Sequence, residues 1–260
     1  MDAGQHLPAT TGRGLKTSFR KGLNLTLVLT VLMLIALSTF HAVTTDRWGQ
    51  DLPITEFFQQ LDVGSFDDVL FWMGVRGVAG VIMAGAAAWL WLGGHRVASV
   101  MVILMLIPDA SSFILRDIFE RPRPSASLVN VEGGPQGFSF PSGTALHTMF
   151  FYGFMLYLLP KLTTSKRLLW GFRCILVLWI LFQGAWVVHH GRHWSSDVVG
   201  GYLYGAFYLI IWMRLYPIVH SWDARNPNLL ESLDFRLRRA MAKIGIGTGS
   251  TDPVDSTSEK

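Results

Sequence analysis

Two residues in the second half of the chain have the types and spacing of an oriented nucleophile. His193 is followed four residues later by Asp197, in the segment VVHHGRHWSSDVVGG. At the start of a helix, this spacing lets the carboxylate bind one imidazole nitrogen and leaves the other free to attack. A purely structural ion pair would have the same spacing, so catalysis also requires residues that bind a substrate.

A second group of residues has the types that bind phosphate. Arg116 and Arg123 lie in RDIFERPRP, and a guanidinium group matches the oxygens of a phosphate and stays charged. Ser142 and Gly143 begin a predicted helix, where a hydroxyl and free backbone N–H groups bind anions. Together with His193, they indicate phosphoryl transfer through a phosphohistidine, without a metal ion or cofactor. The alternatives are arginines that anchor lipid headgroups and a serine that only caps its helix.

Long apolar blocks must position these segments. Half of the chain is hydrophobic and 15% is charged, whereas about 25% is charged in soluble proteins. A helix that crosses a bilayer needs about 20 mostly apolar residues. Six blocks approach this length: residues 22–43, 70–93, 97–115, 142–159, 168–188 and 198–216. The sequence therefore predicts an all-α fold, a polytopic membrane bundle of six transmembrane helices.

Basic residues predict how this bundle is oriented. Lys and Arg are frequent before the first block and after the sixth, which predicts that both termini are cytoplasmic. With six spans in a cell membrane, the active site then lies at the outer face, towards the periplasm or exterior. We expect a basic N-terminal tail at 1–21, a six-helix membrane domain at 22–216 and a C-terminal tail at 217–260. This last tail is predicted to be amphipathic at first and then disordered.

The polar motifs resemble those of the type 2 phosphatidic acid phosphatase superfamily, in its membrane branch of lipid phosphate phosphatases. The family pattern is KxxxxxxRP, PSGH and SRxxxxxHxxxD, and this chain reads RDIFERPRP, PSGT and WVVHHGRHWSSD. The resemblance implies that His193 attacks phosphorus and that Asp197 orients it. It also implies that Arg116 and Arg123, with the Ser142–Gly143 backbone, hold the phosphoryl oxygens. Water then hydrolyses the phosphohistidine.

Two positions depart from the family pattern. Thr144 replaces the histidine that, by this resemblance, protonates the leaving group, and Val187 replaces a phosphate-binding arginine. Thr144 itself is expected at the phosphate because of its place in the motif. His147, one helical turn after Thr144, is a candidate acid, and Arg192 is a candidate phosphate ligand. The alternatives are a His147 that faces other helices and an Arg192 that is a surface charge.

The leading interpretation is an integral membrane phosphatase that acts on a lipid phosphate or diphosphate. General acid catalysis contributes about 100- to 10,000-fold, and a phosphate leaving group needs an acid far less than an alkoxide does. A missing acid therefore favours a lipid diphosphate, such as a polyprenyl diphosphate. Two alternatives stay open: a lipid phospho-group or headgroup transferase, and a non-catalytic member that binds lipid phosphate or a partner protein. The expected partners are a lipid substrate and the bilayer, with no nucleic acid, and the oligomeric state stays open.

Overall fold

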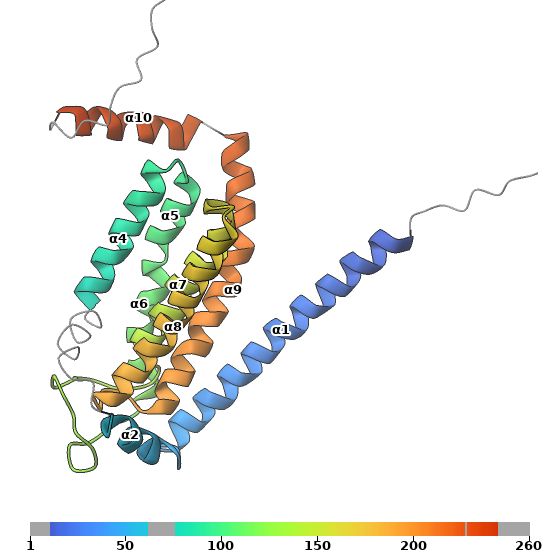
Figure 1. Cartoon of the computed structure of the whole chain (residues 1–260). Coiled ribbons are helices and arrows are strands. Elements are labelled where there is room, and N and C mark those ends of the chain that lie inside the picture. The colour runs from blue at the N-terminus through green and yellow to red at the C-terminus, as the bar shows by residue number, and fades with distance from the viewer. Residues whose placement is uncertain (1–10, 62–75, 227, 244–260) are drawn as a thin grey trace, which may run out of the picture. The chain divides into compact units, whose positions relative to one another are not determined.

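Helices are the regular elements throughout the described part of the chain, which comprises residues 11–61, 76–226 and 228–243 of the computed structural model. The all-α prediction is therefore confirmed for these ranges (Figure 1). In chain order the helices are α1 (Thr11–Thr44), α2 (Asp51–Gln59), α4 (Arg76–Leu92), α5 (Arg96–Leu104), α6 (Leu106–Phe119), α7 (Gly143–Leu162), α8 (Lys166–His189), α9 (Ser195–Arg225) and α10 (Asn228–Lys243).

Four of the predicted spans have the length and apolar character needed to cross a membrane. They lie at Leu25–Thr44, Arg96–Phe119, Lys166–His189 and Ser195–Arg225. The helix α7 has 20 residues and is not among these four, and α4 has 17 described residues. Residues 70–75 of the predicted second span lie outside the described ranges. These apolar helices identify a multi-pass membrane protein.

The predicted third span is broken into α5 and α6 at Met105. Pro108 follows within the first turn of α6, and a proline has no N–H to donate to the carbonyl four residues earlier. The chain therefore changes from one helix to the next near the middle of this span. Asp109 follows Pro108 directly, so the break lies beside the polar residue of this segment.

The chain divides into two compact units, residues 1–215 and 216–260. The first unit holds α1 to α8 and most of α9. The second holds the end of α9 and the helix α10, in which Arg238 donates to Asp234 at 2.9 Å, one turn apart. The predicted disordered end, residues 245–260, lies outside the described residues.

Within the first unit, α7 carries a large share of the buried core. Its fully buried side chains include Ala145, Leu146, Phe150, Phe151 and Phe154. The neighbouring helix α9 approaches α7 closely because residue 201 is a glycine. A Cβ atom at Gly201 would lie 2.5 Å from the Ser142 carbonyl oxygen. This close approach brings the first turn of α9 beside the first turn of α7.

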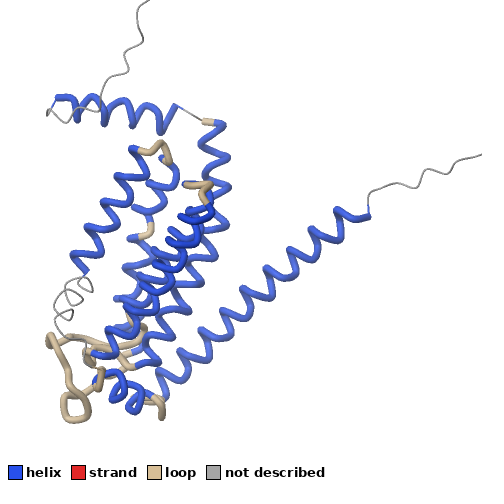
Figure 2. The backbone as a smooth tube through the Cα atoms, in the orientation of Figure 1, coloured by secondary structure: helices blue, strands red, loops and turns tan. Residues whose placement is uncertain are grey.

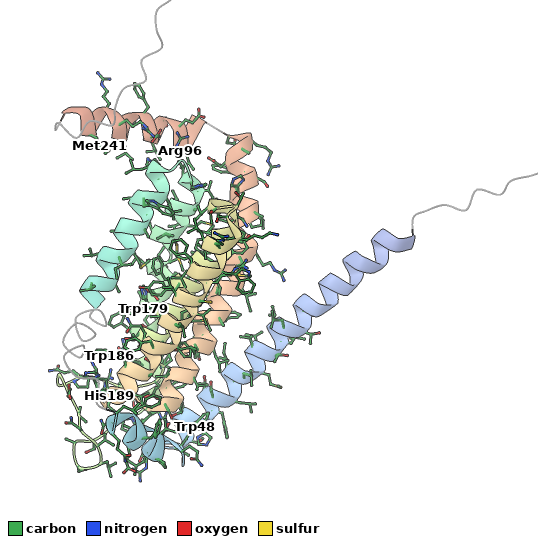
Figure 3. The ribbon with its side chains drawn as sticks, viewed as in Figure 1. Trp48, Arg96, Trp179, Trp186, His189 and Met241 are labelled. Atoms are coloured by element: carbon green, nitrogen blue, oxygen red, sulfur yellow. The ribbon has the colours of Figure 1, made fainter. Side chains whose placement is uncertain are left out.

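The loops that carry the polar motifs meet at one end of the first unit, beside α2, where Figure 2 draws them in tan. Backbone hydrogen bonds join them: Ser139 N–H donates to the Arg121 carbonyl at 2.9 Å, and Ser142 N–H donates to the Asp197 carbonyl at 3.0 Å. The end of α8 packs against α2 here, with His189 Nδ1 2.7 Å from the Phe58 carbonyl oxygen (Figure 3).

Candidate active site

A tight turn between α8 and α9 positions His193. Gly191 in this turn has a φ of 58°, a left-handed conformation that glycine adopts without strain. A Cβ atom there would also lie 2.1 Å from the Asn130 carbonyl oxygen. The turn directs the His193 side chain into the protein, where the residue is only 6% exposed.

The two ring nitrogens of His193 have different partners. Nδ1 lies 2.8 Å from the Ser139 carbonyl oxygen, which accepts only, so Nδ1 carries the proton and donates. Nε2 then keeps its lone pair and lies 3.4 Å from Nη1 of Arg123. The ring nitrogen with a lone pair therefore faces a guanidinium group, a type of group that can bind phosphate oxygens.

Arg123 is held in place by main-chain carbonyl oxygens. Nη1 donates to the Arg192 carbonyl at 2.5 Å, and Nε donates to the Gly137 carbonyl at 3.1 Å. These bonds fix the guanidinium beside His193.

The surroundings keep the His193 imidazole neutral. Burial lowers the pKa of His193 from 6.5 to about 4, the nearby Asp197 carboxylate opposes this, and the charges of Arg123 and Arg116 lower the pKa further. At neutral pH the ring is therefore uncharged, as a nucleophile must be.

Asp197 contacts groups other than the one predicted. Its Oδ2 lies 3.7 Å from His193 Nδ1, beyond a hydrogen bond, and accepts instead from the Trp194 N–H at 2.8 Å. The bond that orients His193 goes to the Ser139 carbonyl oxygen. Asp197 therefore lies within ion-pair distance of the imidazole, beyond the length of a hydrogen bond.

Arg121, which the sequence interpretation did not select, joins the two loops beneath the site. It is 1% exposed, and its Nη1 donates to Asp197 Oδ1 at 2.5 Å while Nη2 donates to Asp51 Oδ2 at 3.1 Å. Nη1 also donates to Ser196 Oγ at 2.8 Å. A buried charge requires such partners. This pairing joins residues far apart in the chain, so motif spacing does not reveal it.

Asp51, at the start of α2, completes this network. Its Oδ1 accepts from the Ser196 N–H at 2.8 Å and from Ser195 Oγ at 2.7 Å, so it caps the first turn of α9 from another helix. Its Oδ2 also accepts from the Trp48 N–H at 2.6 Å. We define the Arg121–Asp51–Asp197 cluster as the buried ion network; it fixes the loop that carries His193.

Arg116 and the start of α7 lie beside this arrangement. Arg116 is 6% exposed, and its Nε donates to the Ser112 carbonyl at 2.9 Å. Ser142 is the N-cap of α7, and its Oγ accepts from the Ala145 N–H at 3.4 Å. Ser142 therefore caps its helix, as the alternative interpretation proposed, and Gly143 provides the first helical N–H.

His147, the candidate acid, pairs with an aspartate of a neighbouring helix. Its Nδ1 lies 2.5 Å from Asp109 Oδ2, and both residues line a cavity of about 260 Å³ together with Gly143 and Thr144. His193 and Arg123 are absent from the residues that line this cavity. The structure thus groups His147 with Thr144 and not with the nucleophile.

The structure places the Arg192 side chain on an aromatic ring. Its guanidinium carbon lies 5.7 Å from the centre of the Trp186 ring, and burial lowers its pKa. Arg192 contacts the site through its main chain, because its carbonyl oxygen accepts a hydrogen bond from Arg123. Among the described residues, no group of three or more His, Cys, Asp or Glu is placed to hold a metal ion.

Comparisons with known proteins agree with the motifs. Residues 93–220 match the PAP2 superfamily model. Lipid phosphate phosphatase delta of Arabidopsis thaliana is 28% identical over 137 residues, a match that covers 48% of this chain and 32% of that protein. The chain thus aligns with about a third of this curated relative.

A solved structure has the same fold. The crystal structure of a transmembrane PAP2 type phosphatidylglycerolphosphate phosphatase from Bacillus subtilis matches with a TM-score of 0.61 and 17% identity, over 72% of this chain and 94% of that one. The three polar motifs all lie within residues 93–220. Through that segment, this chain is similar to the PAP2 superfamily.

Proposed function

We propose that the chain is an integral membrane phosphatase that hydrolyses a lipid phosphate or lipid diphosphate through a phosphohistidine. The observation that carries this proposal is the pair of contacts at His193: Nδ1 to the Ser139 carbonyl oxygen and Nε2 near Arg123. The similarity to the PAP2 superfamily and to a lipid phosphate phosphatase supports it.

In this mechanism His193 Nε2 attacks phosphorus, and the bond between phosphorus and the leaving oxygen breaks. The charges of Arg123 and Arg116 stabilise the phosphoryl oxygens. The phosphohistidine ring gains positive charge, which Asp197 and the Nδ1–H bond to Ser139 stabilise. Water then attacks phosphorus, releases inorganic phosphate and restores the neutral imidazole.

The leaving oxygen also needs a proton or a low basicity. Thr144 has no group that ionises near neutral pH, and His147 is paired with Asp109. A phosphate leaving group has a pKa of roughly 6, so it needs an acid far less than an alkoxide does. We therefore expect faster release of phosphate from a polyprenyl diphosphate than from phosphatidate. Faster turnover of phosphatidate would contradict this preference.

The enzymatic test compares phosphate release by purified wild-type protein, His193→Ala and a control, His95→Ala. His95 is the N-cap of α5, outside the site. We expect release that is lost in His193→Ala and kept in His95→Ala. Release of alcohol without phosphate would favour a transferase, and no turnover of any lipid phosphate would favour a binding protein. Equal release by wild type and His193→Ala would overturn the mechanism.

We also propose that the site faces outside, with both termini in the cytoplasm. Ser127 lies exposed in the loop after α6, and Ser165 lies exposed between α7 and α8. In a Cys174→Ser background, an impermeant thiol reagent added to intact cells should label Ser127→Cys and not Ser165→Cys. Labelling of Ser165→Cys and not of Ser127→Cys would show that the site faces the cytoplasm, and would contradict this proposal.

A further inference from the structure

The turn that carries His193 is joined to a loop segment from elsewhere in the chain. In the loop before α7, the Glu132 N–H donates to the His190 carbonyl at 3.1 Å. The Asn130 carbonyl oxygen of the same loop lies against Gly191, where a Cβ atom would come within 2.1 Å of it. Two segments that are far apart in the sequence therefore meet at the turn between α8 and α9.

Gln59, the last residue of α2, binds both segments with one side chain. Its Nε2 donates to the Asn130 carbonyl at 2.6 Å and to the His189 carbonyl at 2.9 Å. Its Oε1 accepts from the Asn130 N–H at 3.0 Å. A reversed amide would place Oε1 against two carbonyl oxygens, so these partners fix the orientation of the side chain. One amide thus holds the loop and the turn together.

The helix α2 packs against the end of α8 through other residues (Figure 1). Its first residue, Asp51, belongs to the buried ion network. Near its other end, Ile54 and Phe58 pack against a buried cluster that includes Val188 of α8. Gln59 therefore reaches the turn from a helix that is held at both ends, and a substitution of Gln59 leaves those contacts in place.

The site residues depend on the position of this turn. The Arg192 carbonyl accepts from Arg123, and His193 Nε2 lies 3.4 Å from Arg123 Nη1. A shift of the turn would therefore displace His193 relative to Arg123. A misplacement of about 1 Å in a reacting group can cost roughly 100-fold in rate. The bonds that fix the turn are thus expected to matter for the rate of attack.

We infer that Gln59 is a positioning residue, whose amide holds the turn between α8 and α9 in the geometry that His193 needs to attack phosphorus. Gln59 acts through the main chain of the turn and of the loop. The inference rests on the proposed phosphatase and extends its machinery to α2, a helix outside the three polar motifs.

The test replaces Gln59 by glutamate, which has the same shape. At pH 7 the carboxylate still accepts from the Asn130 N–H, but its other oxygen repels the two carbonyl oxygens that the amide bound. We expect kcat to fall by about 100-fold. Gln60→Glu places the same charge on the next residue, which is exposed, and this control should keep the wild-type kcat. Equal kcat in wild type and Gln59→Glu at pH 7 would overturn the inference.

Protonation returns a donor to Gln59→Glu. The unperturbed pKa of a glutamate is about 4.3, and carbonyl oxygens beside it raise this pKa because they bind only its protonated form. Lowering the pH from 7 to 5 should therefore recover kcat relative to wild type, in which the pKa of His193 is about 4. Recovery would also show that the variant is folded. The same ratio of variant to wild type at both pH values would contradict the inference. The neighbouring titratable groups cancel in this ratio, because both proteins have His189, His190 and Glu132.

Amide hydrogen exchange separates this inference from the proposed catalysis. The exchange of residues 187–193 reports on the turn without any substrate. Gln59→Ala should exchange faster there than wild type or Gln60→Ala, because local opening costs less once the amide is removed. Faster exchange, with no phosphate release by wild type, would support the role of Gln59 and reject the phosphatase. Phosphate release by wild type, with exchange and kcat unchanged in Gln59→Ala, would do the opposite.

Discussion

The buried carboxylates at the loop end of the first unit differ from the carboxylate in the cavity. Asp51 and Asp197 both pair with Arg121, and each also accepts a backbone N–H. Asp109 has one partner, His147, and its second oxygen has no donor within the described ranges. The carboxylates of the first region are compensated by a buried cation, whereas, among the described residues, the carboxylate of the cavity wall is paired only through one oxygen. The comparison teaches that paired charges hold the loop end together, and that the described part of the cavity wall lacks such a network.

The comparison predicts its largest effect in the buried ion network. Arg121→Met leaves Asp51 and Asp197 buried without their cation, and removing one partner of a buried ion pair costs about 3–5 kcal/mol. We expect a loss of that size in the free energy of unfolding, measured by denaturant in detergent micelles. The control is Arg238→Met, because its ion pair with Asp234 is 45% exposed on the arginine side and such pairs contribute at most about 1 kcal/mol. Equal losses of unfolding free energy in the two variants would show that the buried ion network contributes no more than the exposed ion pair.

Arg123→Gln tests whether the loop end of the first unit is catalytic as well as structural. Removing a donor that stabilises transition-state charge lowers kcat by about 100- to 1,000-fold. Since Arg123 donates to main-chain carbonyl oxygens, its loss should change stability less than the loss of Arg121 does. Phosphate release and denaturant unfolding are measured on the same samples. A large loss of stability with unchanged kcat would show that Arg123 is structural and not catalytic.

Asp109→Asn should behave unlike changes in the buried ion network. The asparagine side chain has the shape of the aspartate and can still bind His147. Removing a poorly compensated buried charge often leaves the stability of a protein unchanged or raises it. We expect the apparent melting temperature to be kept or raised. A sharp drop in melting temperature would show that Asp109 is structural.

The smallest effect concerns pH. The pKa of His193 is lowered to about 4, so the neutral imidazole dominates above that pH and is protonated below it. Wild-type kcat/KM should therefore persist from pH 7 to pH 5 and fall as pH drops through about 4. In Arg123→Gln the residual activity should be lost at a higher pH, because a charge that lowers this pKa is absent. A wild-type loss centred near 6.5 would contradict this account.

The sequence predicted the elements and part of the site. Apolar blocks gave the helices, because lipid-facing and core residues alike must be apolar, and motif spacing brought His193, Arg123 and Ser142 to one end. It did not reveal the Ser139 carbonyl oxygen, since every residue has a carbonyl and only the fold decides which one faces the imidazole. It also missed the pairing of Asp109 with His147, because a contact between two helices has no fixed spacing along the chain.

The most direct test of the central claim is to trap the phosphorylated protein. Wild type mixed with a lipid phosphate labelled in its phosphoryl group, and quenched within one turnover, should carry label that is acid-labile, as a phosphoramidate is. The label should map to the peptide containing His193 and be absent from His193→Ala, while His95→Ala retains it. Label that persists in His193→Ala, or rapid phosphate release with no labelled protein at any time, would contradict the account.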